Sequence, residues 1–510
     1  MLSQNKTSLI PLSLLLSSAL LLSACNELLQ LAEQNDSVEA SQLDDQLDRL
    51  IEINDMAAAR GGASVPDISE PMAQLGKKLF FSKALSGDET VACATCHHPA
   101  LHGADQLSLP VGVNATLPDQ LGLSRLAIDM DLPIGRNSPT VFNAALWRQG
   151  LFWDGRIERL GSGQISTPDS GQNQADPTAG ATLLAAQAKF PVVTESEMLG
   201  SHFGLTENDD QVRALLAQRL GEQAAGLATN EWLSHFQQAF GRLDSADNLI
   251  TFANIALAIS DYERSMLFID SPWQAYLDGD MAALSTAQKR GARLFLATPE
   301  GDGAHCVRCH QGPTFTDERF NLVAFPQFGA FTLQADGDVG RETVTFDRAD
   351  RYRFRTPSLL NVELTAPYGH AGTYGSLEQV LAHYANPQQT VERYFANADY
   401  CDLPQFRADA DCASLFPDAQ RLSMLALDEL TAAQQNNFQQ NNFQQNNFQQ
   451  NNGSGRVLRP TRLSSAEIGD LVAFLQALTD PCAAQLDCVA PWIAQDPLDN
   501  PDGRMLTARF

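Results

Sequence analysis

Two Cys-x-x-Cys-His motifs, at residues 93–97 and 306–310, constrain this chain more than any other feature of its sequence. In motifs of this kind the two thiols form thioethers with the vinyl groups of a haem, and the adjacent imidazole binds the iron. One such pentapeptide can also serve zinc binding or thiol redox chemistry, but two in one chain favour covalent haem. The predicted attachment residues are Cys93, Cys96, Cys306 and Cys309, and the predicted iron ligands are His97 and His310.

Each motif follows a helix of similar sequence, which suggests a duplicated single-haem unit. Gly76 precedes Leu79-Phe80 in the first helix, and Gly291 precedes Leu294-Phe295 in the second. Few stretches alternate between apolar and polar residues as strands do. We therefore expect a mainly α fold with few short strands. Two cytochrome c-like haem domains, residues 67–269 and 270–480, would precede a C-terminal extension over 481–510.

The N-terminal segment has the pattern of a secretion signal. An apolar run from Leu9 to Leu22 follows Lys6 and ends in Ser-Ala-Cys25. It is too short to span a bilayer. The ending resembles the bacterial lipobox and predicts a signal peptide over 1–24, lipidation of Cys25 and an acidic spacer over 25–66. An ordinary signal peptide is the alternative. The lipid would tether the protein in the periplasm at the outer membrane.

Four further cysteines lie outside the motifs, at Cys401, Cys412, Cys482 and Cys488. In an oxidising compartment their short spacings favour two local disulfides, which would pair Cys401 with Cys412 and Cys482 with Cys488. The sequence alone also permits other connectivities.

The composition is strongly acidic, with a formal net charge of −27. This charge disfavours nucleic acid and anionic membrane surfaces as partners, and it favours a basic or neutral partner or simply keeps the protein soluble. Residues 434–455 are rich in Gln and Asn, and Asn-Asn-Phe-Gln-Gln recurs three times there. Because such tracts usually stay disordered, we expect a disordered insert without chemistry of its own.

From about Leu75 to Leu478 the chain resembles the bacterial di-haem cytochrome c peroxidases and their MauG-type relatives. The matching segments are residues 76–81, 136–140, 152–156, 197–198, 312–317, 355–359, 361–368 and 376–378. The resemblance implies a peroxidase-type oxidoreductase that uses hydrogen peroxide. Its expected second partner is a small electron-donor cytochrome or a protein substrate.

The resemblance also implies how each iron is closed or left open. In the family's peroxidases that need reductive activation, a second histidine lies some way after the first motif. Here no histidine occurs between Gly103 and Trp147, and His98 and His102 lie too close to the attachment site. The His97 haem is therefore expected to be five-coordinate and open, with closure by Met130 as the alternative.

At the second haem, the family uses either a methionine or, in MauG-type proteins, a tyrosine, and the matching residue is Tyr384. Ser376 and Gln379 predict a capping box, and Leu377, Leu381 and Tyr384 fall on one helix face, so Tyr384 should point inward. Without the resemblance it would read as a packed core tyrosine. As an anionic ligand it would favour ferric and higher iron.

The remaining site residues are matched by position. Trp153 corresponds to a tryptophan between the haems, whose alternative role is core packing. Gln187, Pro191 and Glu197 correspond to residues beside the open iron, where Glu197 would act as general acid and base. The long stretch between Trp153 and Gln187 departs from the family pattern.

The resemblance further implies a calcium ion between the haem domains, held by the Asn137 side chain and the backbone carbonyls of Thr365 and Pro367. Asn137 could otherwise serve in a turn or a helix cap. His370 and His383 are expected to be structural or to support a ligand residue. Three functions remain open: MauG-like oxidation of a protein or cytochrome donor, conventional peroxide removal, and electron transfer without turnover.

Overall fold

The computed structural model describes residues 36, 38–56, 65–201, 208–221, 227, 229–441, 455–496 and 499–510. The expected signal peptide and Cys25 lie outside these residues. In the described part, helices dominate and the strands are few and short, as expected. No helix among these residues is both long and apolar enough to cross a bilayer.

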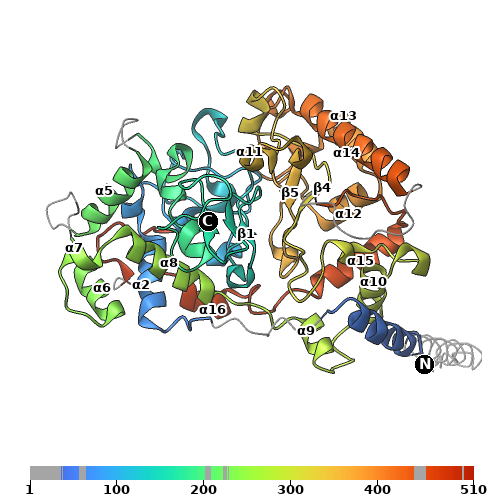
Figure 1. Cartoon of the computed structure of the whole chain (residues 1–510), viewed down its shortest axis with the longest axis horizontal. Helices are drawn as coiled ribbons and strands as arrows, with labels where there is room; N and C mark the ends of the chain where they lie inside the picture. The colour runs from blue at the N-terminus through green and yellow to red at the C-terminus, as the bar shows by residue number, and fades with distance from the viewer. Residues whose placement is uncertain are drawn as a thin grey trace, which may run out of the picture.

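The helices form two groups that lie side by side in Figure 1. The first group comprises α2 (Pro71–Phe81), α3 (Cys93–Cys96), α4 (Leu183–Gln187), α5 (Asp209–Gly221), α6 (Trp232–Phe240), α7 (Ala246–Leu249) and α8 (Phe252–Ser265). The second comprises α9 (Pro272–Leu277), α10 (Thr286–Leu296), α11 (Glu342–Thr345), α12 (Leu377–Ala385), α13 (Pro387–Ala396), α14 (Ala419–Asn441) and α15 (Ser465–Gln476). A last short helix, α16 (Leu486–Val489), lies beside the first group (Figure 1).

Each group is built on one close helix crossing that precedes a haem motif. Helix α2 crosses α8 at Gly76, where an added Cβ would lie 1.9 Å from the Ala258 carbonyl oxygen. Helix α10 crosses α15 at Gly291, where an added Cβ would lie 1.9 Å from the Asp470 carbonyl oxygen. Only glycine permits such an approach of two backbones. The repeated crossing supports the duplication inferred from the sequence.

Separate apolar clusters stabilise the two groups. The first includes Phe80 of α2 and Tyr262 of α8, with ring centroids 4.9 Å apart. The second includes Phe295 of α10 and Phe474 of α15, at 5.3 Å. A third cluster combines Leu107, Leu109 and Val111 with Phe325, Phe328 and other residues of the second group. The groups therefore meet through an apolar contact as well as through the site described below.

The strands form two small antiparallel sheets. In the first, β1 (Gly150–Leu151) pairs with β2 (Ile157–Arg159), which pairs with β3 (Ile165–Ser166). In the second, β4 (Phe320–Leu322) pairs with β5 (Arg353–Arg355).

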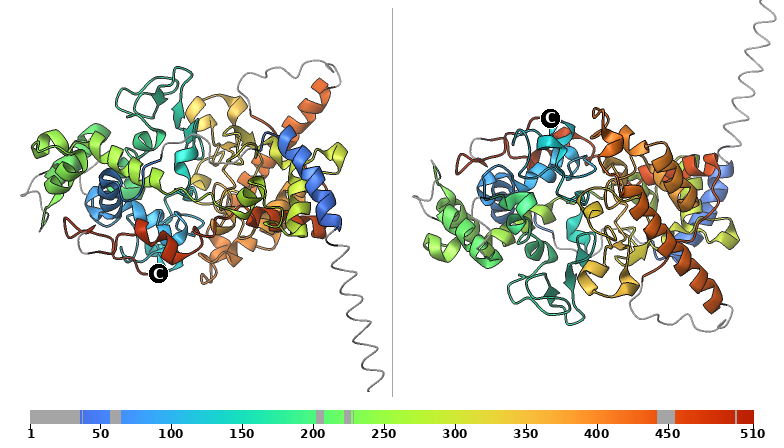
Figure 2. Two further views of the ribbon diagram at one scale, coloured as in Figure 1. Left: turned by 90° about the horizontal axis from the view of Figure 1, so that it is seen from below. Right: turned by 90° about the horizontal axis from the view of Figure 1, so that it is seen from above.

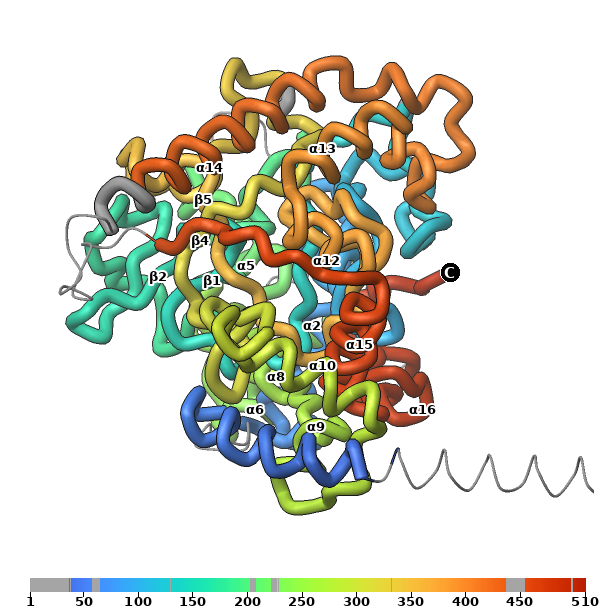
Figure 3. The backbone as a smooth tube through the Cα atoms, turned by 90° about the vertical axis from the view of Figure 1, so that its right-hand side faces the viewer, coloured from blue at the N-terminus to red at the C-terminus, as the bar shows by residue number. Residues whose placement is uncertain are grey.

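The segment expected to be a free spacer is packed on the second group. Residues 38–53 are helical. Leu47 is fully buried in the second cluster, and Asp44 pairs with Lys289 at 2.7 Å. Figure 3 shows this helix running past α9. Residues 38–56 of the expected spacer are therefore packed on the second group, where the apolar face of their helix is buried.

The C-terminal extension returns to the first group (Figure 2). The Trp492 carbonyl accepts a hydrogen bond from the Tyr262 hydroxyl at 2.6 Å, and Asp502 accepts one from the Trp232 indole at 3.0 Å. The two ends of the described chain thus pack on opposite groups.

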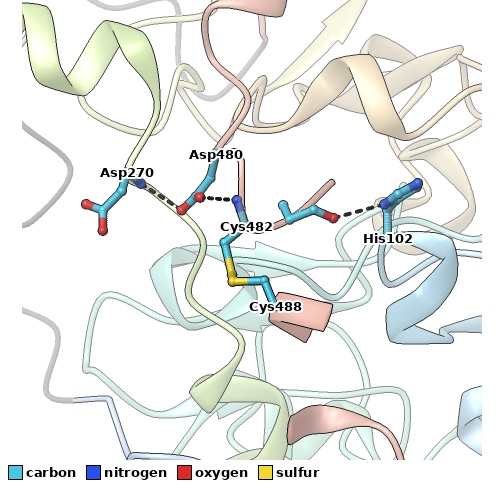
Figure 4. The surroundings of a disulfide bond; sticks show 6 residues. His102, Asp270, Asp480, Cys482 and Cys488 are labelled. Carbon is cyan, nitrogen blue, oxygen red and sulfur yellow. Dashed lines mark hydrogen bonds between the residues drawn. A yellow bond between two sulfur atoms is a disulfide. The ribbon is translucent and has the colours of Figure 1, made fainter. Parts of the chain in front are cut away.

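The disulfides join Cys401 to Cys412 and Cys482 to Cys488, the pairs favoured by their spacing. Figure 4 shows the second pair, where the adjacent Ala483 carbonyl lies 3.1 Å from His102 Nδ1. His102 is therefore engaged outside the haem motif.

Helix α14 extends into the Gln/Asn-rich segment and ends at Asn441. The expected disorder from residue 434 therefore differs from the structure over 434–441. Residues 442–454 of the segment lie outside the described residues.

Candidate functional site

One continuous cavity of about 1420 Å³ is lined by both haem motifs. Single small-molecule sites usually occupy roughly 300–1,000 Å³, so this cavity is large enough for more than one such group. Its lining includes every residue predicted to hold or serve the haems: Cys93, Cys96, His97, Trp153, Gln187, Pro191, Glu197, Cys306, Cys309, His310 and Tyr384.

Both motif histidines are oriented through their Nδ1 atoms. His97 Nδ1 lies 3.3 Å from the Gly103 carbonyl, and His310 Nδ1 lies 3.0 Å from the Phe315 carbonyl. Donation from Nδ1 to a carbonyl leaves Nε2 as the lone-pair nitrogen. Burial lowers the pKa of His97 to about 4, and it also lowers the pKa of His310. Both rings are therefore neutral, which is the form that binds a metal.

The four motif cysteines form no disulfide and face the cavity. Burial raises the pKa of Cys93 and of Cys306 to about 12, so both are protonated thiols at neutral pH. Paired thiols beside a neutral imidazole, repeated in a cavity of this size, fit two covalently attached haems.

On the first side of the cavity, Gln187 ends α4, Pro191 begins a 3-10 turn, and Glu197 lies in the π-helical turn Glu195–Leu199. Burial raises the pKa of Glu197, and Arg156 opposes that shift. Met130 does not line the cavity, whereas Met198 does but packs in the first cluster with 3% of its surface exposed. Burial of the Glu197 carboxyl thus disfavours its charged form.

On the second side, Tyr384 lies on α12, which begins with the predicted Ser376–Gln379 capping box. Burial raises the pKa of Tyr384, and Cys309 and Cys306 raise it further. Among the described residues, none forms a hydrogen bond with the Tyr384 hydroxyl. The hydroxyl of Tyr374, by contrast, lies 2.8 Å from His383 Nδ1. Tyr384 therefore offers a free oxygen to the cavity beside the second motif.

Trp153 is held by both groups of helices. Its indole Nε1 donates to the Asn137 carbonyl at 2.9 Å, and its own carbonyl accepts from the Arg355 backbone at 2.9 Å. Arg355 belongs to β5 of the second group and stacks on Trp147. Trp153 consequently lies where the two groups meet, in the cavity shared by both motifs.

A buried ion cluster beside Trp153 was not anticipated. Arg136 donates to Asp154 at 2.5 Å and to both carboxylate oxygens of Asp338 at 2.7 Å. Arg136 and Asp154 lie in matched segments, but no local sequence signal marks Asp338 as their partner. The cluster joins the two groups and fixes the segment that carries Trp153.

A second unanticipated group is Glu263 on α8, which lines the cavity near Cys93. Burial raises its pKa to about 8, and its Oε2 has no hydrogen-bond partner among the described residues. The sequence did carry a signal, because Ile255, Ile259 and Glu263 are spaced by four on one apolar face.

The residues matched to a calcium site, Asn137, Thr365 and Pro367, also line the cavity. Asn137 Nδ2 donates to the Leu107 carbonyl at 2.8 Å. Among the described residues no hydrogen bond is made to Asn137 Oδ1 or to the Thr365 and Pro367 carbonyls. An amide oxygen and two carbonyls fit a hard cation.

The two unassigned histidines occupy buried positions. His383 is bonded at both ring nitrogens, to Tyr374 and to the Val323 carbonyl, each at 2.8 Å. His370 stacks on Phe354 with centroids 3.8 Å apart. The contacts of His383 are structural, as expected.

Comparison with known proteins agrees with this geometry. A family model described as di-haem cytochrome c peroxidase matches residues 70–282. The cytochrome c551 peroxidase of Pseudomonas aeruginosa is 33% identical over 324 residues, which cover 63% of this chain and 73% of that protein. The methylamine utilization protein MauG of Methylorubrum extorquens is 30% identical over 315 residues, covering 61% and 67%.

A solved structure shares the fold over nearly the whole length. The crystal structure of a MauG-like protein associated with microbial copper homeostasis aligns with a TM-score of 0.51 and 21% identity, over 87% of this chain and 97% of that one. Both haem motifs line one cavity, and the relatives are named cytochrome c peroxidase and MauG. These findings define the family. This chain belongs to the di-haem cytochrome c peroxidases and is an oxidoreductase that acts on peroxide.

Proposed function

We propose that the protein is an exported, lipid-anchored MauG-like peroxidase with two unequal haem sites. The His97 site is open to hydrogen peroxide, and the His310 site is closed by Tyr384. The observation that carries this proposal is the Tyr384 hydroxyl, which belongs to a residue lining the cavity beside the second motif and makes no hydrogen bond to any described residue. A ligand to iron would satisfy it.

The chemistry divides between the haems and the protein. The haems supply the redox chemistry, in which peroxide, two electrons and two protons give two molecules of water. Glu197 would take one proton from peroxide and return that proton to the departing oxygen. Its raised pKa supports both roles, because a group that titrates closer to neutral pH can donate as well as accept.

Gln187, Pro191 and Trp153 have supporting roles in the cavity. Gln187 and Pro191 line the same cavity as Glu197, where they would limit the space for water. Trp153 lines the cavity shared by the two motifs and is fixed at both its indole nitrogen and its carbonyl. That fixed aromatic ring supports a role for Trp153 in passing electrons between the two sites.

The two candidate functions differ in where the electrons that reduce peroxide come from. A tyrosinate ligand at the second site would favour oxidised iron over a role as a simple reductant. The proposal is therefore that oxidising equivalents are held within the protein and then withdraw electrons from a cytochrome or a protein side chain. Conventional removal of peroxide, with reduction preceding each turnover, is the second candidate.

The test is the reaction of the fully ferric holoprotein with one equivalent of hydrogen peroxide, followed in a stopped-flow spectrometer. The proposal predicts a haem spectral change without any added reductant. A reaction that occurs only after addition of one electron per protein would favour the conventional peroxidase. No reaction in either state would overturn both.

A calcium ion between two cytochrome c-like domains is also proposed, on the three oxygens of Asn137, Thr365 and Pro367. Calcium titrated into chelator-treated holoprotein should raise its melting temperature, and Asn137→Ala should reduce the rise. Magnesium is the control, because its octahedral geometry is less tolerant. An equal response to both ions, or to neither, would contradict the site.

A further inference from the structure

The disulfide between Cys482 and Cys488 closes a loop of the C-terminal extension that lies against the segment after the first haem motif. Figure 4 shows this disulfide beside His102. Helix α16, which contains Cys488, packs on the 3-10 turn Pro99–Leu101. Within the loop, the carbonyl of the buried Ala483 accepts a hydrogen bond from His102 Nδ1 at 3.1 Å. A distant segment therefore fixes the side chain of His102.

The start of this loop is itself fixed by Asp480. Its carboxylate accepts hydrogen bonds from the backbone nitrogens of Asp270 and Cys482, each at 2.8 Å (Figure 4). Its own backbone nitrogen donates to Asn361 Oδ1 at 2.8 Å, and Asn361 Nδ2 donates to the Phe268 carbonyl at 2.9 Å. The loop thus begins at a rigid point, and the disulfide closes it six residues later.

His102 connects this loop to the segment that orients the first iron ligand. The carbonyl of His102 accepts a hydrogen bond from the Thr140 hydroxyl at 2.7 Å. The carbonyl of the next residue, Gly103, accepts from the Val141 backbone at 3.0 Å and faces His97 Nδ1 at 3.3 Å. A continuous path of contacts therefore leads from the Ala483 carbonyl through His102 and Gly103 to His97.

The other backbone acceptor of the His97 ring belongs to the same assembly. Pro139 forms a backbone hydrogen bond with the ring, and it directly precedes Thr140, which binds the His102 carbonyl. A displaced His102 would therefore move both acceptors. The strength of donation from Nδ1 sets the basicity of an imidazole as a ligand, and a more basic ligand favours ferric over ferrous iron.

The second motif provides an internal comparison. His310 Nδ1 lies 3.0 Å from the Phe315 carbonyl, and the adjacent Thr316 donates its hydroxyl to the Thr356 carbonyl at 2.7 Å. At each motif, the acceptor carbonyl thus lies next to a side chain that is fixed on a distant carbonyl. The second motif finds this anchor within its own group, whereas the first uses the C-terminal extension.

We propose that His102 is a positioning residue for His97, and that the loop closed by Cys482 and Cys488 holds His102 in place. The loop thereby lowers the reduction potential of the haem at the first motif, because a firmly oriented Nδ1 donor favours ferric iron. The inference goes beyond the proposed function, since it concerns the basicity of an iron ligand, whichever haem binds peroxide.

The experiment is a potentiometric titration of the holoprotein without peroxide, followed by haem absorbance, which gives one midpoint for each haem. His102 has a φ of 61°, so the test variants are two residues that tolerate the left-handed region. His102→Gly removes the side chain, whereas His102→Asn keeps an N–H donor at a similar distance from the backbone.

His102→Gly should raise one midpoint and leave the other unchanged. The expected rise is about 59 mV, which corresponds to an increase of about tenfold in the ferrous-to-ferric ratio at a fixed potential. His102→Asn should stay closer to the wild type, because the donor is retained. Thr316→Val removes the anchor at the second motif, so any midpoint that it moves should be the other one.

The loop is tested by the pair Cys482→Ser and Cys488→Ser, which should raise the same midpoint as His102→Gly. The matched control is the pair Cys401→Ser and Cys412→Ser, which removes the disulfide of the second group. Both pairs should lower the melting temperature. Only the first pair should shift the midpoint, so the potential separates positioning from stability.

Unchanged midpoints in His102→Gly, or equal shifts in His102→Gly and His102→Asn, would overturn the proposal. An equal shift from the two cysteine pairs, or a shift of the same midpoint by His102→Gly and Thr316→Val, would also contradict it. Haem content equal to that of the wild type is required of every variant. Because the assay contains no peroxide, failure of the proposed function would leave this result unaffected.

Discussion

Replacing Gly291 by alanine tests whether the close helix crossing holds the second haem site together. An added Cβ would lie 1.9 Å from the Asp470 carbonyl oxygen, whereas ordinary contact begins at 3.4 Å. Helices α10 and α15 would therefore have to separate by about 1.5 Å and loosen the packing of Phe295 against Phe474.

The expected magnitude follows from two opposing terms. Alanine gains about 1 kcal/mol over glycine in a helix interior, and overpacking costs about 1–3 kcal/mol, or more where backbone is the obstacle. We expect a net loss of about 2 kcal/mol in the free energy of unfolding, because the obstacle is a carbonyl and not a flexible side chain. For a group of this size that corresponds to a fall of about 4–8 °C in melting temperature.

The control is Gly469→Ala in α15, where an added Cβ meets nothing within 4 Å. That variant should be stabilised by up to about 1 kcal/mol. Calorimetry of the holoproteins measures the melting temperatures of both variants. The spectrum of the second haem should change in Gly291→Ala, and that of the first haem in Gly76→Ala. A Gly291→Ala protein as stable as the wild type would refute the reasoning.

Two further predictions concern the buried carboxyls. Glu197→Gln should slow the reaction with peroxide about 10²–10⁴-fold, measured by stopped flow, while both haems stay attached; a rate within threefold of wild type would exclude proton transfer by Glu197. Glu263 has a pKa raised from 4.5 to about 8, so its contribution to stability is complete below about pH 4.5 and is lost as the pH rises through 8. Glu263→Gln should therefore flatten the decline in melting temperature between those values, and an unchanged decline would rule out this group as its cause.

The motif residues could be predicted from the sequence because their chemistry is local. Two thiols and an imidazole within five residues have few other uses, so Cys93, Cys306 and their neighbours could be assigned before any fold was known. Tyr384 required the helical spacing as well as the family resemblance. Both assignments depend on residues that lie close together in the sequence.

The parts that sequence could not predict depend on contacts between distant segments. Asp338 carries no local sign that it binds Arg136, since the two are 202 residues apart. The apolar face of its helix indicated that Leu47 would be buried. No nearby feature of the sequence identified the second group as the surface on which Leu47 packs.

Electron paramagnetic resonance of the ferric holoprotein tests whether the two haems are unequal. We expect one high-spin haem and one low-spin haem, with the low-spin signal lost or shifted in Tyr384→Phe and the high-spin signal retained. Two low-spin signals in the wild type, or a spectrum unaltered by Tyr384→Phe, would contradict it.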